Sequence, residues 1–292
     1  MESGFRSCHP FVVFFYYLCV GFLAMYFNHP AFLLVACLLL FGANLAHGGG
    51  KALRKWIPSL VWMSVAIIVL NPLLNSRGTH IFFYFRGKQV TLEATMYGVV
   101  MAQSIVMILL MFISFNIILN GNKFLFVFSS FLPRTAFLTM LAIRFVPLLK
   151  RRLDEISDVQ RIKGTTASTG TVWERVGNGM TMLQILLTWS LQESLDTADS
   201  MKARGYGTGK RNPYIPYRMN KRDKGWLVTM TALFALCVTG GMLGYGKIII
   251  YPALGTLHLY FLDWVLLICM MLLVSFPLLV EGREQLKWKF SV

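Results

Sequence analysis

Residues 92–119 read LEATMYGVVMAQSIVMILLMFISFNIIL, and their only charged side chain is that of Glu93. A helix that crosses the hydrocarbon core of a bilayer needs about 20 consecutive, mainly apolar residues. This stretch therefore predicts a membrane-spanning helix and decides the fold class. Five further apolar segments qualify or nearly qualify as spans: Phe11–Phe27, Ala31–Ala46, Trp56–Leu74, Trp226–Tyr245 and Thr256–Val280.

The first two of these segments are short and are joined by the polar turn Asn28-His29-Pro30. They are compatible with two thin spans or with one hairpin, and we interpret them as two spans. The sequence thus predicts an all-α polytopic membrane protein with about six transmembrane helices.

Composition supports a membrane protein and excludes other classes. The 292 residues are 56% hydrophobic and only 14% charged, and the mean hydropathy is +0.59. Soluble domains carry roughly 25% charged residues. An ordinary soluble enzyme, a disordered protein and a free nucleic-acid-binding domain are therefore excluded. The 5 cysteines show no CxxC spacing, so we expect neither a disulfide framework nor a zinc site.

The charge distribution predicts the orientation. The net charge is +15, and lysine and arginine are retained on the cytoplasmic side of membranes. Residues 120–225 hold 17 Lys/Arg against 8 Asp/Glu, which indicates a cytoplasmic region. With six crossings, both termini are expected in the cytoplasm. The run Ile81–Phe85, followed by Arg86-Gly87 and then Gln89–Thr91, predicts a small extracytoplasmic β-hairpin.

We predict three parts: residues 1–119 with four spans, a cytoplasmic region 120–225, and residues 226–292 with the last spans and a short basic tail. The middle part contains two amphipathic helices. Apolar residues at helical spacing mark the first: Leu138, Leu141, Phe145 and Leu148. Thr171 and Glu174 fit a capping box that begins the second, and Gly205 ends it. Both are too polar to span and should lie at the inner membrane face or against another protein.

No sequence motif supplies an energy source. The segment Gly205–Arg211, GYGTGKR, resembles a phosphate-binding loop, but its glycine spacing is wrong and Arg211 stands where a hydroxyl would hold magnesium. We therefore expect a chain that is not an enzyme, binds no cofactor itself and takes its energy from a partner.

One stretch resembles a known family. Residues 194–206, SLDTADSMKARGY, closely resemble the signature at the end of the second long coupling helix in the transmembrane (T) component of energy-coupling factor (ECF) transporters, the CbiQ/EcfT family. The resemblance implies that residues 120–225 form a coupling domain with two Ala-Arg-Gly motifs, one at the end of each coupling helix. These motifs would dock into grooves on two ABC ATPase subunits.

The second motif is intact as Ala203, Arg204 and Gly205, whereas Ile162, Lys163 and Gly164 stand where the first Ala-Arg-Gly is usual. Lysine keeps the charge of arginine but lacks its planar, bidentate fork. Gln160 and Arg161 near the first motif and Asp199 near the second are expected to support docking.

The resemblance implies a non-catalytic coupling subunit of an ABC importer in the inner or plasma membrane of a prokaryote. ATP would be bound by the two ATPase subunits, and a separate membrane S component would capture a vitamin or metal ion. The lipid bilayer is the other expected partner, and nucleic acid is not. Two alternatives stay open: a conventional permease that binds substrate itself, for which Gln103 and Asn116 are candidate polar groups, and a membrane enzyme or assembly factor whose basic region holds anionic lipid or nucleic acid.

Overall fold

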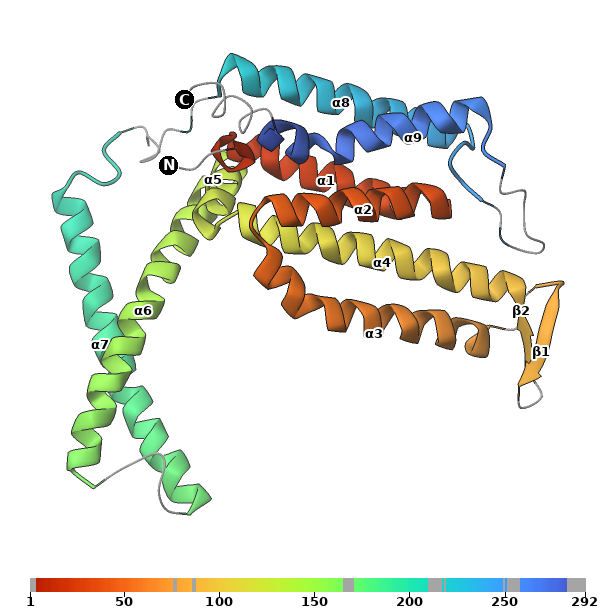
Figure 1. Cartoon of the computed structure of the whole chain (residues 1–292). Coiled ribbons are helices and arrows are strands. Elements are labelled where there is room, and N and C mark those ends of the chain that lie inside the picture. The colour runs from red at the N-terminus through yellow and green to blue at the C-terminus, as the bar shows by residue number, and fades with distance from the viewer. Residues whose placement is uncertain are drawn as a thin grey trace, which may run out of the picture. The chain divides into compact units, whose positions relative to one another are not determined.

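The computed structural model of the protein describes residues 4–75, 78–85, 88–164, 171–209, 217, 219–248, 250 and 258–282. The elements are η1 (Gly4–Ser7), α1 (Pro10–Tyr26), α2 (Pro30–Ala46), α3 (Gly50–Leu74), β1 (Ile81–Phe85), β2 (Lys88–Thr91), α4 (Leu92–Ile118), α5 (Gly121–Phe131), α6 (Pro133–Ile162), α7 (Val172–Ala203), α8 (Lys221–Met242) and α9 (Phe261–Val274) (Figure 1). Within these ranges the only sheet is the two-stranded hairpin, which confirms the predicted all-α class.

Each of the six predicted apolar segments contains a helix. Among the described residues, α3, α4 and α8 are long and apolar enough to cross a membrane. α9 and the helix Phe276–Gly282 pass the same criterion together, with a bend of 54° between them. We expected one unbroken span there. Pro277 accounts for the break, because it lacks the N–H that would continue the helical ladder and its ring clashes with the preceding turn. α1 and α2 are shorter apolar helices of 17 residues each.

Two helices begin earlier than we predicted. α3 starts at Gly50, so the basic residues Lys51, Arg54 and Lys55, expected in a connection, lie in its first turns. α8 starts at Lys221, because Asn220 and Asp223 form a capping box around its first turn.

The predicted hairpin is confirmed: β1 and β2 pair antiparallel, with Tyr84 opposite Gln89. Its turn, residues 86–87, lies outside the described residues. Glu93, which is fully buried at the start of α4, ties the hairpin to the helices. Its carboxylate accepts hydrogen bonds from the Thr79 N–H (3.2 Å), the Thr79 hydroxyl (3.0 Å) and the His80 N–H (3.1 Å). The side of the membrane on which the hairpin lies stays a prediction.

The chain divides into two compact units, residues 1–127 with 217–292 and residues 128–216. In the first unit α2 packs against α4 and α9, while α1 packs against α4 and α8. Three hydrogen bonds reinforce these contacts: the Tyr16 hydroxyl donates to the Val274 carbonyl (2.8 Å), Tyr17 pairs with Ser114 (2.7 Å), and the Asn44 amide donates to the Leu110 carbonyl (3.0 Å). Such bonds are a recognised means of holding helices together in lipid.

The second unit consists of α6 and α7, with 30 and 32 residues, and the last residues of α5. It lies inside the predicted region 120–225. We did not predict α5 as a separate helix. The chain breaks at Leu132 because Pro133 occupies the first turn of α6, where proline is favoured. The capping box of Thr171 and Glu174 at the start of α7 is confirmed.

Candidate functional site

The C-terminus of α7 is a closed turn with Arg204 as the last residue in helical register. Arg204 adopts φ −83° and ψ 8°, and Gly205 follows with φ +80°. The Gly205 N–H donates to the Lys202 carbonyl (2.9 Å), and the Tyr206 N–H donates to the Met201 carbonyl (3.0 Å). This is the Schellman arrangement, whose positive φ favours glycine. The turn confirms that Gly205 ends the helix and leaves the Arg204 side chain exposed at its tip.

The C-terminus of α6 repeats this geometry. Lys163 adopts φ −74° and ψ −3°, Gly164 follows with φ +81°, and the Gly164 N–H donates to the Arg161 carbonyl (3.1 Å). Lys163 and Arg204 therefore occupy the same position, one on each helix, and both are exposed. A positive charge there also complements the helix dipole, a purely local role that lysine and arginine fill equally well.

The three supporting residues have different surroundings. Asp199 lies 3.7 Å from the Lys202 ammonium in an exposed i,i+3 pair, so its described partner is Lys202. Arg161, the residue directly before Ile162, is exposed, and Gln160 is half-buried. Among the described residues, no hydrogen bond or ion pair holds the Arg204 guanidinium.

α6 and α7 run antiparallel, which places the two basic tips at opposite ends of the pair. Phe137 stacks on Tyr206, and further along α6 Arg152 lies over the Trp189 ring. Higher residue numbers in α6 thus contact lower residue numbers in α7, as in an antiparallel pair. Arg204 lies beside the first turns of α6, and Lys163 lies at the far end of α6. At 1.5 Å per residue the two tips are about 37 Å apart along the helix axis.

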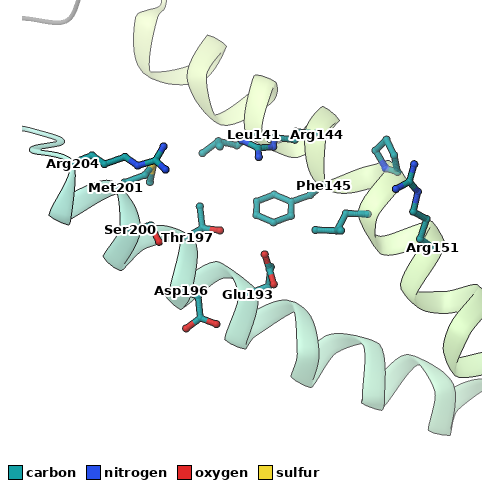
Figure 2. Close-up of a pocket in the computed structure, with 12 residues that line it drawn as sticks. Leu141, Arg144, Phe145, Arg151, Glu193, Asp196, Thr197, Ser200, Met201 and Arg204 are labelled. Carbon is teal, nitrogen blue, oxygen red and sulfur yellow. The ribbon is translucent and has the colours of Figure 1, made fainter.

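A groove of about 610 Å³ lies between α6 and α7 next to Arg204. Arg144 and Arg151 of α6 line it together with Arg204, and the Glu193 carboxylate points across it toward Phe145 (Figure 2). Sequence reasoning identified Phe145 only as part of an apolar face. The pairing of this face with the C-terminal half of α7 depends on the tertiary crossing, for which the sequence offers no signal.

One face of α7 is apolar and exposed. Val176, Met180, Leu187, Leu191 and Leu195 are each at least 59% exposed, and they follow one another at helical spacing. Between Val176 and Gln192 the sequence contains no charged residue. A face of this size on a soluble surface marks a site covered by protein or membrane.

The described residues contain no group of three or more His, Cys, Asp or Glu side chains that could hold a metal ion. At the opposite end of α7, the hydrogen bonds from Thr171 lower the pKa of the Glu174 carboxyl below its ordinary value of 4.5, because they favour the ionised form of the capping box. The Glu174 carboxylate at the start of α7 and the Arg204 guanidinium at its end each have the sign that the helix dipole favours.

Comparisons with known proteins agree with the resemblance of residues 194–206. A family model for CbiQ, described as a cobalt transport protein, matches residues 8–215. The energy-coupling factor transporter transmembrane protein EcfT of Lacticaseibacillus paracasei is 25% identical over 236 residues, 76% of this chain and 88% of that protein. EcfT of Leuconostoc gelidum subsp. gasicomitatum is 27% identical over 176 residues, 56% of this chain, and the match spans only 65% of that relative. EcfT of Bacillus selenitireducens is 32% identical over 104 residues, 35% of this chain and 38% of that protein.

Proposed function

This chain belongs to the CbiQ family of membrane transport proteins, and from this premise we propose that it is the coupling subunit of an ECF-type importer. In the proposed mechanism each of two ABC ATPase subunits binds one of the two basic helix ends, one at Lys163 and the other at Arg204. ATP binding brings the ATPases together and shifts α6 against α7. That movement passes to a separate membrane subunit that captures the cargo, a vitamin or a metal ion.

The observation that carries the proposal is the matched pair of basic helix ends. Two exposed cationic side chains occupy equivalent caps at opposite ends of an antiparallel helix pair. A partner with two similar grooves, such as a dimer of ATPases, can engage both tips at once. Arginine is among the residues that contribute most to protein interfaces, and a guanidinium without a described partner is free to pair with a carboxylate.

The exposed face of α7 supports a second partner within the membrane. The uncharged run from Val176 to Gln192 covers about half of α7, and this half can lie against an apolar surface. Leu187 and Leu191, 62% and 68% exposed, would be buried there. We assign this face to the cargo-binding subunit and to lipid, and we propose that α6 and α7 lie on the cytoplasmic side with both chain termini.

A permease that binds cargo itself receives less support. The Asn116 amide donates to the Phe112 carbonyl of its own helix (2.9 Å), so this polar group is already used within α4. Gln103 lies where α2 packs on α4, because its backbone carbonyl accepts a hydrogen bond from the Cys37 thiol. Its side-chain Oε1 is buried without a hydrogen-bond partner among the described residues, so Gln103 is the polar group that the alternative retains.

Charge reversal at one tip tests the proposal. The chain, carrying an affinity tag, is purified from its host membrane, and co-purifying ATPase subunits are quantified by mass spectrometry together with ATP hydrolysis. Arg204→Glu should reduce ATPase recovery by about 30-fold or more, the equivalent of ~2 kcal/mol for an arginine anchor. Lys202→Ala, which removes a neighbouring exposed cation, is the matched control and should retain the ATPases. Full ATPase recovery with Arg204→Glu in a correctly inserted protein would contradict the proposal.

A further inference from the structure

The turn that presents Arg204 is attached to the opposite helix by an aromatic contact. Tyr206 follows Arg204 by two residues, and its ring stacks on that of Phe137 in the second turn of α6, with centroids 5.4 Å apart and an interplanar angle of 20°. Offset stacking of this kind adds to the stabilisation that burial of the rings provides. The contact joins α6 and α7 at the end of the pair where Arg204 lies.

Backbone hydrogen bonds make Tyr206 and Arg204 parts of one turn. The Tyr206 N–H donates to the Met201 carbonyl (3.0 Å), and the Gly205 carbonyl accepts from both the N–H (3.2 Å) and the hydroxyl (2.7 Å) of Thr208. Gly205 holds the left-handed conformation, φ +80°, on which the turn depends. These hydrogen bonds hold the backbone before and after Arg204 in one turn. If the Tyr206 ring is held in place, the backbone of Arg204, from which the guanidinium projects, is therefore held as well.

The other tip has a different environment. Ile162, directly before Lys163, is 88% exposed, so the apolar neighbour of that cation is not packed on α7. The two tips share a backbone conformation but differ in their surroundings: Tyr206 beside Arg204 is stacked on α6, whereas Ile162 beside Lys163 is exposed.

We propose that Phe137 and Tyr206 are positioning residues that set the direction of Arg204 and carry its displacement to the first turns of α6. The ring pair acts through Arg204 and does not itself enter the partner. With the stack in place, a force on Arg204 moves the start of α6 together with the end of α7. Without it, the end of α7 loses this direct link to the start of α6, and α6 responds through contacts further along the pair, such as that of Arg152 with Trp189. The transport role of the pair rests on the proposed function, whereas the stack itself does not.

The stack is tested by distance measurements on the purified full chain. Spin labels are attached at Lys202→Cys and Met140→Cys, two exposed positions that flank the ring pair, in a background without the 5 native cysteines. Double electron–electron resonance then gives the distribution of distances between the ends of the helices. We expect a narrow distribution in the parent and a distribution at least about twice as broad in Tyr206→Ala and in Phe137→Ala, because either change removes the stacking contact.

Two control variants separate the ring from other effects. Tyr206→Phe keeps the ring and should keep the narrow distribution. Tyr84→Ala removes a tyrosine ring that is 65% exposed in β1 and should also leave the distribution unchanged. A narrow distribution in Tyr206→Ala, or a broad one in Tyr206→Phe, would overturn the proposed stack.

A second measurement links the stack to docking. ATPase recovery, measured as for Arg204→Glu, should fall about three- to tenfold in Tyr206→Ala, the range expected for one aromatic pair, and should be retained in Tyr206→Phe. If the parent chain recovers no ATPase, the proposed function is wrong, but the distance measurements still show whether the Phe137–Tyr206 stack holds the two helices together. Unchanged ATPase recovery in Tyr206→Ala, with the parent chain recovering ATPases, would overturn the positioning role.

Discussion

The guanidinium carbon of Arg152, about two thirds of the way along α6, lies 4.7 Å from the ring centroid of Trp189, near the middle of α7. Arg152 also pairs with Glu155 one turn further along α6. Arg152 lies 11 residues before Lys163 and Trp189 lies 15 residues before Arg204, so the contact is located between the two tips. This cation–π contact contributes to the packing of α6 against α7 at the crossing.

Removal of the ring at the crossing should loosen the helix pair. Trp189→Leu keeps an apolar side chain but abolishes the cation–π contact, and we expect a loss of roughly 1 kcal/mol of unfolding free energy. Proteolysis of the purified protein within residues 128–216 should become correspondingly faster. Trp173→Leu is the matched control, because Trp173 is 87% exposed at the start of α7. Equal protease sensitivity of the two variants would count against a stabilising crossing.

Lys163→Arg should be tolerated and should strengthen ATPase recovery. Lys163 and Arg204 share one cap geometry, and arginine adds a bidentate fork for a carboxylate. The measurement is ATPase recovery from membranes, with Lys163→Ala as the loss-of-charge comparison. A severe loss with Lys163→Arg would show that Ile162-Lys163-Gly164 is not the counterpart of Ala203-Arg204-Gly205.

Gly205→Ala should weaken docking by distorting the turn. A side chain at φ +80° is strained by about 1–2 kcal/mol, and the strain falls on the turn that carries Arg204 and Tyr206. Gly205→Asn should behave more like the parent, because asparagine is the next most common residue at this cap. Thermal unfolding and ATPase recovery check both variants. Equal recovery by the alanine variant and the parent would show that this turn does not orient Arg204.

His29 should make the membrane unit sensitive to mild acid. It is 7% exposed, its Nδ1 accepts from the Ala31 N–H (3.3 Å), and burial lowers its pKa below the usual 6.5, with Asp263 partly opposing the shift. Below about pH 6.5 His29 is therefore protonated more readily in the unfolded chain than in the folded chain. The free energy of unfolding consequently falls as the pH falls through that value.

His29→Asn keeps a capping acceptor and removes the titration. Thermal midpoints at pH 7.5 and pH 5.5, measured in detergent, should differ less in this variant than in the parent. An equal drop in both proteins would assign the acid sensitivity to other groups.

Local signals in the sequence predicted much of this structure. The apolar run 92–119 forms α4, Thr171 and Glu174 cap the start of α7, and Gly205 ends it, as predicted. Each of these features depends on residues close together in the chain, so propensity and spacing are sufficient.

Features that depend on packing between distant segments were missed. Nothing near Phe137 indicates that its ring meets Tyr206, because that contact follows from the crossing of two helices. The separate helix α5 and the bend at Ser275 had signals in Pro133 and Pro277, but a continuous apolar composition obscured them. The family was predictable because residues 194–206, which carry the resemblance, are contiguous in the chain.

In the proposed complex, Lys163 and Arg204 each contact one ATPase subunit. A photo-crosslinking amino acid placed at residue 163 or 204 in living cells, followed by mass spectrometry of the captured protein, tests it most directly. An ATPase subunit should be captured from each of these two positions, and none should be captured from a crosslinker at Tyr84 in the hairpin. Capture of ATPase from neither helix tip, or capture from the hairpin instead, would contradict it.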